Sequence, residues 1–159
     1  MSCNCACNRV TLTTVIVGSF RKHLSHILDL KKQLERHQVT VLSPIEDNVI
    51  NPNADFVIFQ SDPTNNLKFL QDAVFHKIKN STFVVIANIN GYIGRAALLE
   101  MGYALAVGVS IYTVEPINDP HFSPYCKELK EIFPNISIPV ENIGKKSLQF
   151  MANKIERQP

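Results

Sequence analysis

The sequence predicts an α/β protein, a three-layer sandwich in which helices cover both faces of a mostly parallel sheet of five strands. Short runs of β-branched residues alternate with segments whose apolar residues recur at helical spacing, and this alternation is typical of parallel βαβ units. The run at 82–89 is apolar almost throughout, which suits a central strand covered on both faces. We therefore expect a doubly wound sheet of the Rossmann or flavodoxin type, with right-handed crossovers.

The first half of the chain supplies two of the expected strands. The first strand is expected at 10–17, where β-branched residues dominate, and an amphipathic helix follows it. The second strand, at 38–43, ends before Pro44. The polar stretch 45–63 is then a long loop, in which the apolar run 56–59 forms a short strand or a lid. Loops of this length are uncommon and often functional.

The second half repeats the alternation of helix and strand. We expect a helix at 65–79, the apolar central strand at 82–89, and a third helix that starts near Gly94. Gly108 ends that helix as a C-cap glycine does, and a fourth strand is expected at 109–114.

The remaining residues complete one domain. A short helix is expected at 125–133, a fifth strand at 135–140, and a closing amphipathic helix at 145–157. Residues 1–9 are expected to form a flexible tail, and 10–159 a single domain.

The bulk composition argues against several classes of protein. The chain has 159 residues and a formal net charge of +2 at pH 7, which is too small to indicate a nucleic-acid or membrane surface. No apolar run is long enough to cross a bilayer, and the first residues lack the features of a signal peptide. We expect a cytoplasmic protein that acts on a small molecule and binds neither nucleic acid nor a membrane.

Three of the four cysteines, Cys3, Cys5 and Cys7, alternate near the start of the chain. Thiolates at this spacing could chelate a soft metal such as zinc or copper(I). Because the C-x₂-C pairs and histidines of an ordinary structural zinc site are missing, we expect incidental thiols and no metal or other cofactor. Cys126 stands alone and is expected to be structural.

Glu100 is the residue around which the functional interpretation is built. It lies within the third helical pattern, among Leu98, Leu99, Met101 and Ala104. A carboxylate among apolar neighbours is costly to ionise, and a glycine-containing turn precedes its helix, at the sheet edge where open α/β folds bind ligands. We expect Glu100 to face a pocket for a sugar or nucleotide. The alternative is that it caps or ion-pairs within a core helix.

A second turn, Gly18-Ser19-Phe20-Arg21, follows the first strand. Helix N-terminal amides and an arginine both favour phosphate or carboxylate, so this turn suits an anion; an ordinary βα turn with a surface arginine fits the residues equally well. An anion held near Glu100 suggests chemistry at an anomeric carbon, where a carboxylate can attack as nucleophile.

Four ordered segments resemble the nucleoside 2-deoxyribosyltransferase superfamily, which includes the deoxynucleoside 5′-monophosphate N-hydrolases. Residues 18–21 are similar to the family's glycine-serine-x-arginine turn, and residues 41–44 to its valine-x-x-proline strand end. Residues 100–104 (Glu-Met-Gly-Tyr-Ala) look like the family's E-x-G-Y-A segment, and 90–94 like the glycine-bearing loop before it. Together the segments span about 10–114.

The resemblance implies a role for each matched position. Glu100 would be the nucleophile that displaces the base, Tyr103 would place Glu100 or line the base pocket, and His76 is a candidate proton donor to the base. The residues expected at the substrate or its phosphate are Gly18, Ser19, Phe20, Arg21, Asn88, Asn90, Gly91, Tyr92, Gly94 and Arg95. The implied activity is N-glycosidic cleavage or transfer on a nucleoside or nucleotide, in a homodimer or larger homo-oligomer.

The chain also departs from the family pattern. The transferases carry aspartates in the loop before the glutamate, where this chain has Asn88 and Asn90, and asparagine cannot be a general acid. The hydrolases often have a serine in the phosphate loop, where this chain has Arg95 and two alanines. These departures keep a second hypothesis open, a catalytically silent sensor of a nucleotide or an ADP-ribose-type ligand on the same fold.

Overall fold

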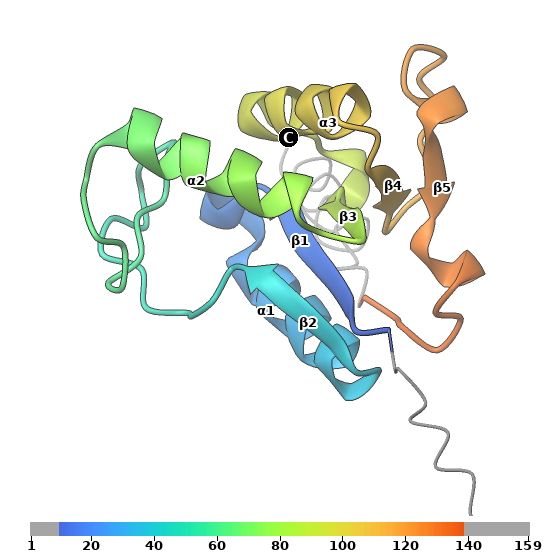
Figure 1. The fold of residues 1–159 in the computed structure, drawn as a ribbon, viewed down its shortest axis with the longest axis horizontal. Helices are drawn as coiled ribbons and strands as arrows, with labels where there is room; N and C mark the ends of the chain where they lie inside the picture. Colours follow the sequence, from blue (N-terminus) through green and yellow to red (C-terminus); the bar gives the residue numbers. More distant parts are fainter. Residues whose placement is uncertain (1–9, 139–159) are drawn as a thin grey trace, which may run out of the picture.

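The computed structural model describes residues 10–138, and within this range five strands form one sheet (Figure 1). The strands are β1 (Leu12–Gly18), β2 (Val39–Ser43), β3 (Phe83–Ala87), β4 (Ser110–Thr113) and β5 (Cys126–Glu128). The α-helices are α1 (Phe20–Arg36), α2 (Leu67–Lys79) and α3 (Arg95–Ala106), and the 3₁₀ turns are η1 (Ile89–Gly91), η2 (Ser123–Tyr125) and η3 (Leu129–Glu131). The order is β2-β1-β3-β4-β5 and each neighbouring pair is parallel, so the predicted fold class is confirmed.

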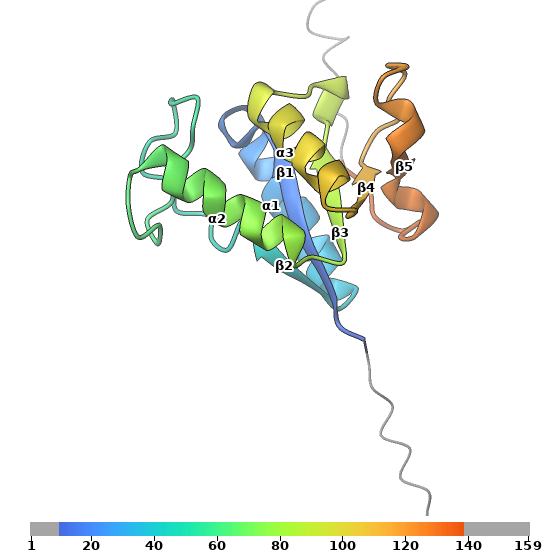
Figure 2. The same cartoon turned by 45° about the horizontal axis from the view of Figure 1, so that its top comes forward.

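Helices cover both faces of the sheet because alternate strand residues point to opposite layers. Ile16 of β1 packs with Ile27 and Leu30 of α1 on one face. Its neighbour Val17 packs on the other face, where Met101 of α3 lies in the same cluster. Figures 1 and 2 show α2 and α3 together on that second face.

The strand order creates a crevice at the carboxyl ends of β1 and β3. β1 lies between β2 and β3, so the connection after β1 leaves toward one side of the sheet and the chain later returns on the other. Such a switch point opens a crevice between the two connections, and open α/β sheets bind ligands there. Gly18 ends β1 opposite Ala87 of β3, and a Cβ on Gly18 would lie 3.2 Å from the Ala87 side chain. Glycine therefore permits the close approach of these two strands.

The fifth strand is not where the sequence predicted it. β5 is Cys126–Glu128, which pairs with β4, whereas residues 135–138 of the expected strand form none. The prediction of a helix at 125–133 is also wrong, because this segment contains the end of η2, the strand β5 and the 3₁₀ turn η3. Glu128 and Glu131 form a capping box at η3, so the local helix signal was real, but pairing with β4 determined the backbone on its N-terminal side.

Three of the sequence predictions concern residues outside the described range. They are the tail at 1–9, the closing helix at 145–157 and the last two residues of the strand expected at 135–140. Within residues 10–138, no helix combines the length and apolar character needed to span a membrane.

Candidate functional site

A pocket of about 680 Å³ lies at the crevice between β1 and β3. The predicted site residues that line it are Gly18, Ser19, Phe20, Arg21, Tyr92, Gly94, Arg95 and Glu100. The two turns singled out in the sequence therefore border the same cavity, although they are far apart in the chain.

One end of this pocket is formed by the first turns of α1 and α3. Ser19 caps α1, where its Oγ accepts a hydrogen bond from the backbone N–H of Lys22 at 3.4 Å. Gly94 caps α3 and supplies no side-chain bond. Neither first turn contains an acidic residue that would compensate the partial positive charge of the helix N-terminus. Both of these partial charges therefore face the pocket. Arg21 and Arg95 line the same end. We refer to it as the cationic end.

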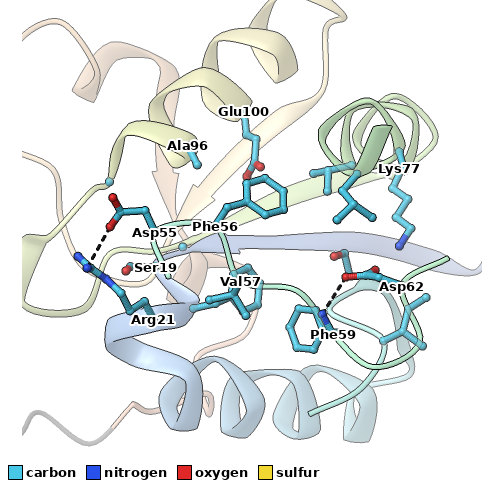
Figure 3. A pocket seen from close by; sticks show the side chains of 18 of the residues that line it. Ser19, Arg21, Asp55, Phe56, Val57, Phe59, Asp62, Lys77, Ala96 and Glu100 are labelled. Atoms are coloured by element: carbon cyan, nitrogen blue, oxygen red, sulfur yellow. Dashed lines mark hydrogen bonds and ion pairs between the residues drawn. The ribbon is translucent and has the colours of Figure 1, made fainter. Parts of the chain in front are cut away.

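Glu100 projects from α3 into the middle of the pocket (Figure 3). Its Oε1 accepts a hydrogen bond from the side-chain amide of Gln71, on α2, at 2.9 Å. Burial raises the pKa of the Glu100 carboxyl to about 7, and the bond from Gln71 acts against this rise because it stabilises the ionised form. The carboxylate is therefore ionised over an accessible pH range while it faces the cavity.

Tyr103 lies one helical turn beyond Glu100 but outside the pocket lining. Its ring stacks on Phe75 of α2 with the centroids 4.5 Å apart. This contact and the bond between Gln71 and Glu100 both join α2 to α3. Tyr103 is thus in a position to hold the two helices in register rather than to touch a ligand.

Residues 44–66, which we call the covering segment, form one wall of the pocket. Val49 and Phe59 form an isolated antiparallel bridge. The side chain of Asn51 donates to the carbonyl of Phe56 at 2.9 Å and accepts from the backbone N–H of Ile58 at 2.6 Å. The predicted lid or strand at 56–59 is therefore a compact loop with one bridge, braced by its own side chains.

The covering segment contacts the first turn of α1 at two points. Arg21 forms an ion pair with Asp55 at 3.0 Å (Figure 3). The Phe20 ring meets the Phe59 ring edge-on, with the centroids 5.6 Å apart. Asp55 is exposed, with 92% of its side chain accessible, so the ion pair is weak and can be exchanged for another anion.

The opposite end of the pocket carries a second pair of charges. Lys77 from the last turn of α2 and Asp62 from the covering segment both line it, and Figure 3 shows them on the far side of Glu100 from Arg21 and Asp55. One oxygen of Asp62 accepts the backbone N–H of Phe59 at 2.8 Å.

Three further predicted ligand-binding residues do not line this pocket, and each bonds to another part of the chain. Asn88 is buried, and its amide exchanges two hydrogen bonds with the backbone of Glu115, at 2.9 and 3.0 Å. The Glu115 carboxylate accepts the backbone N–H groups of Asn90 and Gly91, at 2.9 and 3.0 Å. Asn90 and Gly91 both have positive φ, so this turn forms a small anion-binding concavity that the protein's own carboxylate fills.

His76 does not reach the pocket. It lies on the exposed side of α2, where its Nε2 is 3.3 Å from the side-chain amide of Asn80. His76 and Lys77 both lie off the apolar stripe that Leu70, Val74 and Ile78 form along this helix. The structure separates the two, because only Lys77 turns toward the cavity.

Sequence reasoning missed Gln71, Lys77 and the contacts of the covering segment. Gln71 and Lys77 lie beside the apolar stripe of α2, next to Leu70 and Val74. A polar residue beside such a stripe was the feature of the sequence that could have indicated a place at the edge of the pocket. The length of the 45–63 loop was a second signal. It indicated a functional segment, but it did not show which residues the loop contacts.

Comparison with protein-family models finds no match to the chain, and comparison with curated protein sequences finds none either.

Proposed function

We propose that the chain cleaves or transfers the N-glycosidic bond of a nucleoside or nucleoside 5′-monophosphate, as its resemblance to the nucleoside 2-deoxyribosyltransferase superfamily implies. One observation carries the proposal. The Glu100 carboxylate faces a pocket whose one end combines two helix N-termini with Arg21 and Arg95. This arrangement suits a sugar held above a carboxylate with its phosphate at the cationic end.

The proposed reaction has two steps. Glu100 attacks the anomeric carbon, the bond from that carbon to the base nitrogen breaks, and its electron pair leaves with the base. Water, or the nitrogen of a second base, then attacks the same carbon and releases Glu100 as a carboxylate. In hydrolysis, water supplies a hydroxyl to the sugar and a proton to the released base. In transfer, the N–H proton of the incoming base passes, through solvent, to the released base.

The cationic end has a defined part in this scheme. A 5′-phosphate there would be within the positive field of both helix starts, and it would compete with Asp55 for Arg21. Because Asp55 is almost fully exposed, exchanging it for a phosphate costs little. We therefore expect 5′-monophosphates to bind more tightly than the matching nucleosides.

Base release by the purified full chain tests the proposal. The protein is incubated with nucleosides and nucleoside 5′-monophosphates, and free base is measured by chromatography. We expect release in the wild type and a loss of about 1,000-fold or more in Glu100→Gln, because the amide cannot act as the nucleophile. A glycosylated peptide containing Glu100, detected by mass spectrometry, would identify the intermediate. Absence of release from every substrate would contradict the proposal.

The controls separate chemistry from folding. The folded-state pKa of Glu100 lies above the ordinary glutamate value of 4.5, so the carboxyl stabilises the fold less as pH rises from about 4.5 through 7. Glu100→Gln should therefore be at least as stable as the wild type at pH 8 in thermal unfolding. Glu35→Gln, which removes an exposed partner of Lys31 on α1, should leave activity unchanged.

A ligand sensor without turnover is the second candidate function. Its support is that the candidate proton donor His76 does not line the pocket and that Asn88 is bonded to Glu115. A sensor would be stabilised by nucleotides without consuming them, and Glu100→Gln would bind them as well as the wild type does. Consumption of the stabilising ligand would exclude it.

A further inference from the structure

The end of the pocket opposite the cationic end presents one cation and one carboxylate to whatever lies above Glu100. Lys77 and Asp62 line that end, and Figure 3 shows Glu100 between them and the pair Arg21 and Asp55. A molecule that spans the pocket past Glu100 therefore meets charged groups at both ends.

Lys77 is poised to donate to a ligand. Its side chain is half-buried, and among residues 10–138 its ammonium group has no hydrogen bond or ion pair, only a longer-range attraction to Asp62. Burial lowers the pKa of this ammonium, as expected of a cation that has lost water without gaining a partner. Asp62 keeps one oxygen without a bond to the described residues, because only Oδ2 accepts the N–H of Phe59.

The apolar walls of the pocket suit a flat, apolar-faced ring. Phe56 and Val57 of the covering segment lie on one side, and Leu70 and Val74 of α2 on another. Side chains of this kind can cover the faces of an aromatic ring, which leaves its polar edge as the part that needs hydrogen-bond partners.

Gln71 and Lys77 mark two positions along α2, one beside Glu100 and one toward the far end of the pocket. Gln71 contacts Glu100, and Lys77 lies six residues further along the same helix, about 9 Å at 1.5 Å per residue. A base whose sugar carbon sits at Glu100 would therefore bring the edge remote from the sugar toward Lys77.

We propose that Lys77 and Asp62 recognise the lactam edge of the leaving base, which selects oxo bases such as uracil, thymine, hypoxanthine and guanine over amino bases. This inference rests on the proposed function. A lactam edge presents an exocyclic carbonyl oxygen next to a ring N–H, which match an ammonium donor at the exocyclic position and a carboxylate acceptor at the ring nitrogen. An amino base presents its donor and its acceptor in the opposite order. As the bond from the base nitrogen to the sugar breaks, its electron pair delocalises onto that carbonyl oxygen. Lys77 then stabilises the developing charge, and solvent water afterwards protonates the base.

Matched substrate pairs that differ in one exocyclic group test the assignment. The pairs are uracil against cytosine and hypoxanthine against adenine. All four bases are presented as 5′-monophosphates of the same sugar, and the readout is kcat/KM for base release. We expect the wild type to favour the oxo member of each pair. Lys77→Met, which keeps the apolar stem, should lose about 10- to 100-fold on oxo bases, the size of a hydrogen bond to a charged group, and less than about threefold on amino bases.

The neighbouring lysine supplies the control. Lys79→Met also removes one lysine charge, but from the exposed end of α2, outside the pocket lining. It should leave kcat/KM unchanged for both members of each pair. Lys77→Gln keeps a neutral donor, so its kcat/KM on oxo bases should lie between the values of the wild type and Lys77→Met. It replaces the methionine variant if that one fails to fold. An equal loss on oxo and amino bases, or a wild-type preference for amino bases, would overturn the inference.

Binding of the free bases distinguishes this inference from the proposed function. If no substrate is turned over, the proposed reaction fails, and calorimetric titration with uracil, cytosine, hypoxanthine and adenine still tests Lys77. Tighter binding of the oxo bases that is lost in Lys77→Met would retain the recognition site. Equal binding of all four, or an oxo preference that survives in Lys77→Met, would reject it.

Discussion

At the scale of single residues, the bond between Gln71 and Glu100 balances two opposing requirements of the site. Burial of Glu100 favours the neutral acid, whereas the proposed nucleophile must be ionised. The side-chain amide of Gln71 donates a hydrogen bond of 2.9 Å to the Glu100 carboxylate and so stabilises the ionised form. The pKa of about 7 is the result of both effects, so the proposed activity should be sensitive to pH near neutrality.

Replacing Gln71 with methionine should move the pH profile in a definite direction. Loss of the donor destabilises the carboxylate, so the pKa of Glu100 rises and the acid limb of kcat/KM shifts upward by about one unit, the size of one hydrogen bond to a charged group. Activity should fall most at pH 6 and recover toward the wild-type value at high pH. The measurement is the pH dependence of base release in the wild type and in Gln71→Met.

The profile separates this effect from a general loss of structure. A variant that is merely misfolded loses activity equally at every pH. Gln60→Met, on the exposed surface of the covering segment, should leave the profile unchanged. An acid limb in Gln71→Met that coincides with that of the wild type would show that this bond does not control ionisation.

At the scale of elements, the covering segment determines how the pocket is closed. It contributes both Asp55, which pairs with Arg21, and Phe59, which meets Phe20. Its shape is held mainly by its own bonds, above all the two made by the side chain of Asn51. The segment can therefore be loosened without removing a residue from the core or from the lining of the pocket.

Asn51→Ala should weaken substrate binding while leaving the fold stable. The substitution removes two hydrogen bonds of about 1 kcal/mol each, so the segment samples more open conformations and KM should rise roughly 5- to 30-fold. Limited proteolysis should cut the variant faster within 44–66. Its unfolding temperature should change little, because the sheet and its helices keep their contacts.

Asn53→Ala provides the comparison for this change, because Asn53 lies in the same loop but its side chain makes no hydrogen bond with another described residue. Unchanged KM and unchanged proteolysis in Asn51→Ala would mean that the covering segment keeps its shape without these bonds.

At the scale of the whole molecule, the outer surface of α3 is unusually apolar for a free helix. Leu98, Leu99 and Leu105 are 40%, 56% and 39% exposed. After Arg95 the helix contains a single charged residue, Glu100, and that residue turns toward the pocket. A helix that is apolar on nearly every side is normally buried. This surface supports the proposal that the chain forms a homodimer or larger homo-oligomer.

Leu99→Glu should shift the chain toward the monomer. A carboxylate at the most exposed of the three leucines would have to be desolvated in a contact between copies. We expect the wild type to sediment as an oligomer and the variant as a smaller species at the same concentration. Ile132→Glu, an exposed apolar position after η3, should leave the assembly unchanged. A monomeric wild type would contradict the proposal.

Most of the architecture could be predicted from the order of the amino acids. β-branched runs and helical spacing located β1 to β4 and α1 to α3, because the period of the apolar residues reports which face of an element is buried. The unusual carboxylate at Glu100 and the glycine turn at Gly18 also indicated the region of the pocket. Both signals are local, since each depends only on residues that are neighbours in the chain.

Which polar groups meet depends on how the chain packs in three dimensions. Lys127 and Glu128 interrupt any apolar pattern in β5, and pairing with β4 made this segment a strand. The sequence pattern predicts that Asn88 binds a ligand, whereas in the fold its side-chain amide bonds to the backbone of Glu115. Gln71 reaches Glu100 because α2 packs against α3. Burial follows a repeat that can be read along the chain, whereas a hydrogen bond or ion pair depends on which distant segment lies opposite, and no local pattern encodes that partner.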